Sequence, residues 1–201
     1  SIPLGIIPAG TGNDVARAHG IPLKKAAGII DVLTNGKNRH VGAFRLQGTP
    51  SPSEGGYPEP TNNPAWDGEP DIPGRVVRWV FLESDCGVTS ATARAKLSRA
   101  KWIKGSFKYT YLGITEILPW KKKMAWVKID DNPGEIVDFS MLAATTTEMF
   151  GGGYKVCPGA SPILEHGFLC HAWGLSKLKM LMLMGPLKKG KHVGKWGIEL
   201  K

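Results

Sequence analysis

Short apolar and glycine-rich stretches at the start of the chain predict a strand, a loop and a helix in succession. Leu4–Ile7 is apolar on both faces, which is typical of a buried parallel strand. A glycine loop follows at Gly10–Asp14, where Asn13 and Asp14 are suited to cap a helix start, and Gly20 is suited to end that helix. Apolar residues then recur at helical spacing over Leu23–Leu33, so we expect a second helix there.

Beyond residue 40, some segments have apolar residues at every second position, as in strands, and others have them at helical spacing. A turn rich in Asp, Asn, Pro and Gly at Asp130–Gly134 predicts an antiparallel hairpin. The larger, C-terminal part therefore combines strands with peripheral helices. The pattern predicts strands at Val41–Leu46, Arg75–Leu82, Met124–Ile129, Ile136–Thr145 and Phe168–Trp173, and helices at Thr89–Lys101, Phe107–Leu118 and Leu175–Met184.

One long stretch, residues 48–74, is dense in Pro, Gly, Ser and Asn. Such a composition cannot bury enough apolar area to offset the conformational entropy that is lost on ordering. We therefore expect a disordered insertion at 48–74 that interrupts a domain.

Charge and cysteine content narrow the classes of partner and compartment. The chain has 26 Lys and Arg against 17 Asp and Glu, a formal net charge of +9, so anionic partners are favoured. No nucleic-acid-binding motif accompanies this charge, so we expect a nucleotide or an anionic membrane as partner and no nucleic acid. Three widely spaced cysteines are a poor disulfide framework and indicate a reducing, cytoplasmic location.

The apolar stretches are too short to predict a membrane-spanning segment. A transmembrane helix needs about 20 consecutive apolar residues, and lysines interrupt the longest apolar run of this chain, around Met180–Met184. The first residues lack the basic leader and cleavage site of a signal peptide. They are instead expected to be an interior strand of a longer protein.

The glycine loop is the first candidate site. Between a strand and a helix start, the backbone N–H groups near Gly10 and Gly12 and the positive end of the helix dipole can face a phosphate group. The dinucleotide fingerprint requires Gly or Ala where Val15 stands, and the Walker pattern requires a Gly-Lys pair that is absent. From spacing alone, a phosphate site and a plain tight turn both remain open.

A wider string around the loop closely resembles the catalytic domain of the diacylglycerol kinase family, whose bacterial-type members are soluble lipid kinases. It runs Leu4-Gly5-Ile6-Ile7-Pro8-Ala9-Gly10-Thr11-Gly12-Asn13-Asp14-Val15-Ala16-Arg17, with Gly20-Ile21-Pro22 after it. Looser anchors that look like the second domain of this family follow in the same order: Lys104-Gly105, Tyr109 to Leu118, Phe150-Gly151-Gly152-Gly153, Pro158 and Ala160.

The resemblance implies an α/β plus mainly β fold class. Residues 1–40 would be the end of a three-layer α/β nucleotide-binding domain, and residues 41–201 a β-sandwich-like domain with peripheral helices. The implied reaction moves the γ-phosphate of ATP, with Mg²⁺ bridging the phosphates, to the hydroxyl of diacylglycerol or a similar lipid at a membrane surface. The loop residues that would bind ATP are Gly10, Thr11, Gly12 and Asn13, with Thr11 in direct contact, while Asp14 and Arg17 would fix the loop and helix.

Three departures from the family pattern limit this interpretation. The family's Gly-Gly-Asp-Gly-Thr phosphate loop should lie upstream of Ser1, so we expect this chain alone to be inactive. The family's C-terminal Asp-Gly-Glu motif, which supplies the base, has no counterpart, because Glu199 lacks the preceding Asp and is expected to be a solvated end residue. His166 stands where the family has an Asp that helps hold a structural magnesium, which leaves Glu165 and His166 as candidate metal ligands and a surface turn as the alternative.

Two other functions remain open from the sequence. A sphingoid-base or ceramide kinase is related, although those enzymes usually carry Ser in place of Thr11. A degenerate, non-catalytic binding module is suggested by His166 and by the missing carboxylates. We assign no catalytic residue, and we expect Cys157 and Cys170 to be buried structural residues and not nucleophiles or zinc ligands. The stripe of Leu175, Leu178, Leu181 and Met182 is expected to pack on the domain core in preference to a membrane.

Overall fold

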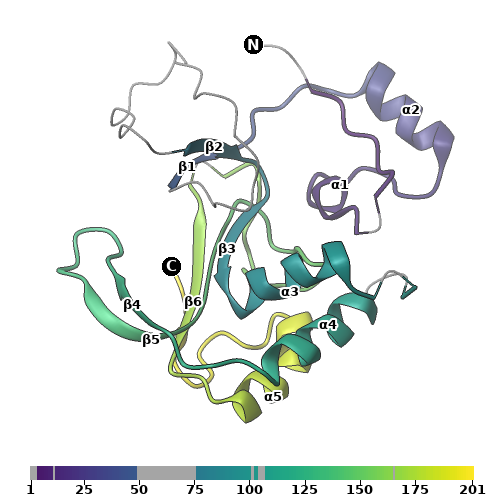
Figure 1. Cartoon of the computed structure of the whole chain (residues 1–201). Coiled ribbons are helices and arrows are strands. Elements are labelled where there is room, and N and C mark those ends of the chain that lie inside the picture. Colours follow the sequence, from purple (N-terminus) through teal and green to yellow (C-terminus); the bar gives the residue numbers. More distant parts are fainter. Residues whose placement is uncertain (1–3, 11, 49–75, 101, 104–106, 165) are drawn as a thin grey trace.

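The N-terminal part of the chain contains two helices and a small sheet (Figure 1). The computed structural model describes residues 4–10, 12–48, 76–100, 102–103, 107–164 and 166–201. Helices α1 (Asp14–Ala18) and α2 (Ala26–Asn35) come first. Strands β1 (Phe44–Gly48) and β2 (Val76–Val80) then pair antiparallel. All four elements agree in type with the sequence prediction.

A five-stranded antiparallel sheet dominates the rest of the chain. The long strand β5 lies at its centre. Strand β3 pairs with one side of β5, β6 pairs with its other side, and β7 pairs with β6. Strand β4 pairs with the first half of β5 and forms the predicted hairpin. The strands are β3 (Glu83–Gly87), β4 (Met124–Val127), β5 (Glu135–Thr145), β6 (Phe168–Trp173) and β7 (Ile198–Leu200).

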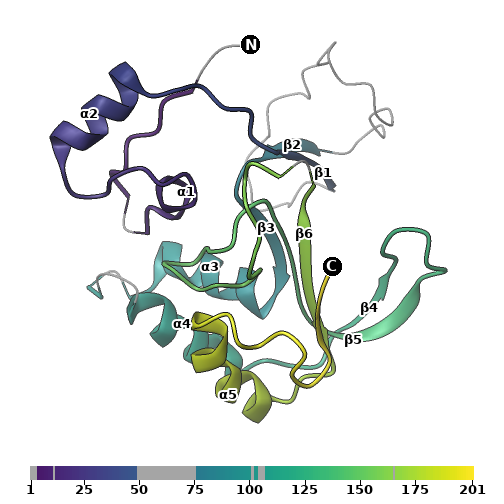
Figure 2. The same ribbon diagram turned by 180° about the vertical axis from the view of Figure 1, so that it is seen from behind.

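Three helices gather on one side of this sheet, as both views show (Figures 1 and 2). They are α3 (Val88–Ser98), α4 (Phe107–Ile117) and α5 (Lys177–Lys188). Ser176 is the N-cap of helix α5, and its hydroxyl accepts a hydrogen bond from the backbone N–H of Lys179 at 3.3 Å. The buried core includes Met141, Ala143, Phe150, Tyr154, Val156, Cys157, Ala160, Cys170, Ala172, Leu183 and Ile198.

The prediction of a buried strand at Leu4–Ile7 is wrong. This segment is irregular, and the side chains of Leu4 and Ile7 are 82% and 68% exposed. A parallel strand needs partners along its edges and cover on both faces, and the described part of the chain supplies neither to this segment. The three-layer nucleotide-binding half therefore stays a prediction, whereas the antiparallel β-rich domain is confirmed.

Two strands were missed, and both depend on tertiary pairing. The sequence of β3, Glu-Ser-Asp-Cys-Gly, has low strand propensity and no apolar alternation. It is held as a strand by its register with β5, from Glu83 opposite Thr145 to Gly87 opposite Met141. Strand β7 has three residues, too few for a recognisable pattern. Of the insertion expected at 48–74, Gly48 is the last residue of β1, and the remainder lies outside the described residues.

Candidate functional site

A cleft of about 600 Å³ lies between the N-terminal loop and the β-rich part of the chain. Its polar end is formed by the glycine loop and by β3 and α3. Its other end is apolar and is formed by the inner faces of α4 and α5 and by the sheet. Residues at the polar end include Gly10, Gly12, Asn13, Asp14, Glu83, Asp85 and Lys96, and those at the apolar end include Ile117, Met141, Leu175, Leu183, Met184 and Leu187.

The glycine loop is held in shape by its own polar groups. The Asn13 side chain accepts a hydrogen bond from the backbone N–H of Gly10 at 2.8 Å, and Asn13 itself is left-handed, with φ of 52°. The Arg17 guanidinium donates to the carbonyl oxygen of Gly12, at 3.1 Å from Nη2 and 3.3 Å from Nε. Arg17 thus fixes the loop as expected, but Asn13 makes no side-chain cap on α1 because its carboxamide is used within the loop.

Asp14 joins the loop to the second part of the chain. Its Oδ2 accepts a hydrogen bond from the backbone N–H of Gly152 at 2.8 Å, across 138 positions of sequence. Its side chain is only 9% exposed. The second oxygen, Oδ1, has no hydrogen-bond partner among the described residues, although Arg17 Nε lies 3.9 Å away. Asp14 was expected to fix the loop and α1, and besides its ion pair with Arg17 it makes this longer-range contact.

The turn that Asp14 reaches requires glycine. Gly151, Gly152 and Gly153 all have positive φ, from 65° to 99°, a region that other residues rarely adopt. A backbone bridge between Phe150 and Tyr154 closes the turn. Close packing adds a second constraint, because a Cβ added at Gly12 would lie 2.9 Å from Asp14 Oδ2 and 3.6 Å from the Cα of Gly152. The glycines of the loop and of the turn therefore allow two backbones to meet at one side of the cleft.

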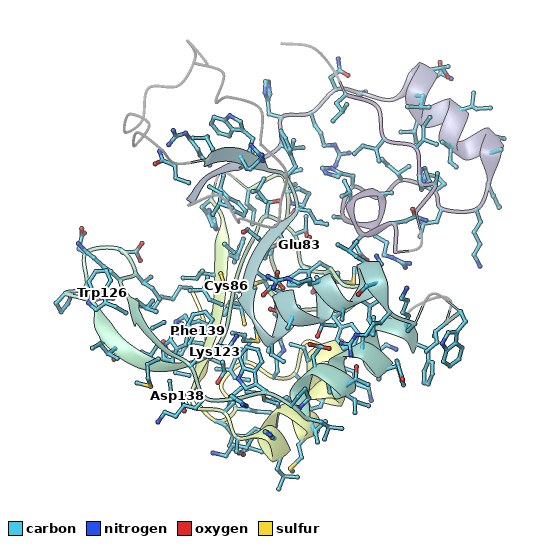
Figure 3. All side chains as sticks on the ribbon, in the orientation of Figure 1. Glu83, Cys86, Lys123, Trp126, Asp138 and Phe139 are labelled. Atoms are coloured by element: carbon cyan, nitrogen blue, oxygen red, sulfur yellow. The ribbon has the colours of Figure 1, made fainter. Side chains whose placement is uncertain are left out.

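Two further carboxylates face the cleft from β3, where side chains two residues apart share one face. Figure 3 labels Glu83 at the start of this strand. Burial and the negative charges of Asp85 and Asp14, opposed by Lys96, together raise the pKa of Glu83 to about 7. Burial also raises the pKa of Asp85, while a hydrogen bond from Thr89 partly lowers it. Glu83 Oε2 has no partner in the described part of the chain.

Sequence reasoning missed Glu83 and Asp85 because it missed β3. The available signal was a pair of acidic residues, spaced two apart, directly after the apolar strand that ends near Leu82. Lys96 on α3 also faces the cleft, where its ammonium group is hydrogen-bonded to the Tyr109 hydroxyl and lies 4.7 Å from the centre of that ring. The polar end of the cleft thus combines acidic groups with one cation held by an aromatic residue.

Two cysteines and a histidine are buried in the core, and the histidine also lines the cleft. Cys157, Cys170 and His192 are fully buried, and His192 Nε2 lies 3.0 Å from the carbonyl oxygen of Val156 and 3.7 Å from Cys170 Sγ. Both cysteines are thus buried, as expected. A hydrogen bond from Cys157, together with His192, lowers the pKa of the Cys170 thiol.

The two candidate metal residues, Glu165 and His166, precede strand β6 in the chain. His166 is exposed and its ring lies 5.0 Å from that of Phe168, while Glu165 lies outside the described residues. In the described ranges, no group of three or more His, Cys, Asp or Glu side chains could hold a metal ion. Imidazole is also a poor ligand for magnesium. The metal-binding role of Glu165 and His166 therefore stays a prediction.

Two other residues were singled out from the sequence, Thr11 and Glu199. Thr11 lies outside the described residues. Glu199 is exposed on β7 and its carboxylate lies 3.7 Å from His171 Nε2, away from the cleft, in agreement with its interpretation as a solvated residue. Among the described residues, no helix has both the length and the apolar character needed to cross a bilayer.

Comparisons with known proteins cover nearly the whole chain. The diacylglycerol kinase catalytic domain matches residues 1–46, and the YegS C-terminal NAD kinase beta sandwich-like domain matches residues 85–200. Diacylglycerol kinases of two Mycobacterium tuberculosis strains, CDC 1551 / Oshkosh and ATCC 25618 / H37Rv, are each 28% identical over 193 residues. That alignment covers 96% of this chain and 54% of the relative, so the chain spans about half the length of the curated relatives it matches.

Solved structures show the same fold. Two crystal structures from Bacillus anthracis str. Sterne, assigned as diacylglycerol kinases, match with TM-scores of 0.60 and 0.53, each at 15% sequence identity. The first match covers 99% of this chain and 56% of the other, and the second covers 97% and 53%. At this level of identity the likeness supports the fold alone.

Proposed function

Because the chain belongs to the diacylglycerol kinase family and carries its YegS-type C-terminal domain, we propose that the complete natural protein is an ATP-dependent lipid kinase. The acceptor would be the hydroxyl of diacylglycerol or of a similar neutral lipid at a membrane surface. One observation carries the proposal: the glycine loop and an apolar pocket share a single cleft. A phosphate donor and an acyl chain could therefore meet inside it.

The polar end of the cleft suits the nucleotide. Gly10, Thr11, Gly12 and Asn13 would form one wall of the phosphate site, because glycines allow a phosphate to approach backbone N–H groups closely. Lys96 faces the same space and would attract the phosphates. Magnesium would enter with ATP as part of the substrate and neutralise the phosphate charge.

The apolar end suits the lipid. Met141, Leu183 and Leu187 offer a lining against which an acyl chain gains free energy by leaving water. Glu83 lies on the same cleft, next to the loop residue Asp14, and its unpartnered oxygen could accept a hydrogen bond from the lipid hydroxyl. In the transfer, that hydroxyl oxygen bonds to the γ-phosphorus of ATP, the bond to the bridging oxygen of ADP breaks, and the hydroxyl proton leaves to a base. No residue of this chain is assigned as that base.

A phosphoryl-transfer assay tests the proposal. The complete natural protein is incubated with γ-labelled ATP and magnesium in the presence of dioctanoylglycerol, sphingosine, ceramide or no lipid. We expect labelled phosphatidic acid to form with dioctanoylglycerol and label to stay with the nucleotide when lipid is omitted. Labelled sphingosine phosphate or ceramide phosphate would favour the related sphingoid-base or ceramide kinase instead. Nucleotide binding with no transfer to any lipid would leave the non-catalytic binding module as the better account.

A further inference from the structure

The outer face of α4 is apolar although it faces solvent. Phe107, Tyr111, Ile114 and, just beyond the helix, Leu118 are spaced as one helical stripe, and all four are exposed, Phe107 to 66%. The inner face, with Leu112 and Ile117, is buried. A helix on the surface of a globular protein ordinarily presents polar residues to water. An apolar stripe on both faces indicates that something other than water contacts the outer one.

Helix α5 repeats this arrangement beside α4. Leu178 and Met182, one turn apart, are 67% and 55% exposed, while Met180 and Leu183 are buried. The expectation that the leucine and methionine stripe packs on the core is therefore wrong for Leu178 and Met182. The reason is that α5 carries apolar residues on more than one side, so packing one face on the core leaves Leu178 and Met182 on the other.

The two helices lie side by side (Figures 1 and 2). A Cβ added at Gly113 of α4 would come within 2.8 Å of the Met184 methyl group on α5, and Lys177 Nζ donates to the carbonyl oxygen of Leu118 at 2.7 Å. The exposed stripes thus belong to one layer of the molecule. We call them together the α4–α5 surface, made of Phe107, Tyr111, Ile114, Leu118, Leu178 and Met182.

The charges around this surface are positive. Helix α5 contains no Asp or Glu. The acidic residue of α4, Glu116, is largely buried and paired with Arg99. Exposed lysines lie on α5 and just beyond the C-terminal ends of α4 and α5: Lys121, Lys177, Lys179, Lys188 and Lys189. Apolar side chains bordered by lysines match a bilayer with anionic headgroups, because the apolar groups enter the acyl boundary while the lysines remain among the phosphates.

We propose that the α4–α5 surface docks the protein on an anionic membrane. The inner faces of the same two helices line the apolar end of the cleft. One helix diameter, about 10 Å, therefore separates the docked surface from the cleft interior. Docking would bring the cleft close to the lipids of the membrane. This benefit rests on the proposed function, whereas membrane binding itself does not require phosphoryl transfer.

Vesicle sedimentation tests the docking. The complete natural protein is mixed with vesicles of phosphatidylcholine alone or of phosphatidylcholine with phosphatidylglycerol. We expect at least about tenfold tighter binding to the anionic vesicles, weakened by salt. Replacing two apolar residues (Phe107→Ser with Leu178→Ser) or two lysines (Lys188→Gln with Lys189→Gln) should each weaken it about tenfold or more. The matched control is Trp126→Ser, an exposed aromatic residue on the β4–β5 hairpin (Figure 3), which should bind like the unmodified protein.

Two results would overturn the docking proposal. One is absence of binding to anionic vesicles by the unmodified protein, as expected if another segment of the protein or a second copy covers this surface. The other is equal binding to anionic vesicles by the Phe107→Ser, Leu178→Ser double variant and by the Trp126→Ser control. Turnover of water-soluble dihexanoylglycerol separates this proposal from the kinase function. A variant that loses vesicle binding but keeps this turnover supports docking, and loss of turnover in the unmodified protein challenges the kinase function alone.

Discussion

Replacing Asp14 with alanine is expected to lower kcat/KM for ATP by about tenfold to a hundredfold in the complete natural protein. The carboxylate accepts the 2.8 Å hydrogen bond from the Gly152 N–H that ties the glycine loop to the Gly151–Gly153 turn. A hydrogen bond to a charged group is worth about 1.5–3 kcal/mol, which corresponds to that range of rates if the loop must be held for nucleotide to bind. Steady-state kinetics with varied ATP measure the effect.

Two control variants separate the positioning role of the Asp14–Gly152 hydrogen bond from the effect of the negative charge of Asp14. Asp14→Asn keeps an acceptor oxygen for Gly152, so it should retain most of the activity that alanine loses if positioning is the main role. Asp31→Ala removes an exposed carboxylate from α2 and should leave the kinetics unchanged. Should Asp14→Ala behave like Asp31→Ala, the contact between loop and turn has no part in catalysis.

Replacing Glu83 with glutamine is expected to stabilise the fold at high pH and to change it little at low pH. Burial, Asp85 and Asp14 raise the pKa of Glu83 from 4.5 to about 7. Between these two pH values the folded state therefore keeps a proton on Glu83 that the unfolded chain has already released. The stability linked to Glu83 is therefore fully present below about pH 4.5 and is lost as the pH rises through 7. At pH 8 the loss amounts to roughly 2–3 kcal/mol.

Urea unfolding followed by tryptophan fluorescence at pH 5 and pH 8 measures this difference. Glutamine cannot ionise, so the free energy of unfolding of Glu83→Gln should exceed that of the unmodified protein by this amount at pH 8, and should be similar to it at pH 5. Glu135→Gln, an exposed carboxylate on β5, serves as the control and should show no such pH dependence. The assignment to Glu83 is wrong if the unmodified protein and Glu83→Gln differ equally at both pH values.

Periodicity predicted the parts of the fold that local sequence determines. Strand β6 was predicted with the observed bounds, Phe168–Trp173, and β5 and α4 to within one residue at each end. Their patterns are clear because each buries one regular set of side chains against the core. Leu4–Ile7 has an equally apolar pattern, but a parallel strand depends on neighbouring strands that the described chain does not provide.

The candidate site could be predicted only in part, because its members come from distant segments. The glycine loop has a local pattern, and the structure places Gly10, Gly12 and Asn13 at the wall of the cleft. Their role in ATP binding stays a prediction. Glu83 was not identified, since its strand forms by pairing with β5 and its pKa depends on Asp14, which comes from a distant segment of the chain. The contact between Asp14 and Gly152 likewise has no local signal.

Hydrogen exchange with bound ligands tests the shared cleft most directly. The complete natural protein is compared without ligand, with a non-hydrolysable ATP analogue, and with dioctanoylglycerol. We predict that the nucleotide slows exchange at residues 10–17 and 151–153, and that the lipid slows it along the inner face of α5. Nucleotide protection confined to other segments, with exchange at residues 10–17 unchanged, would contradict the claim that the glycine loop and the apolar pocket form one binding cleft.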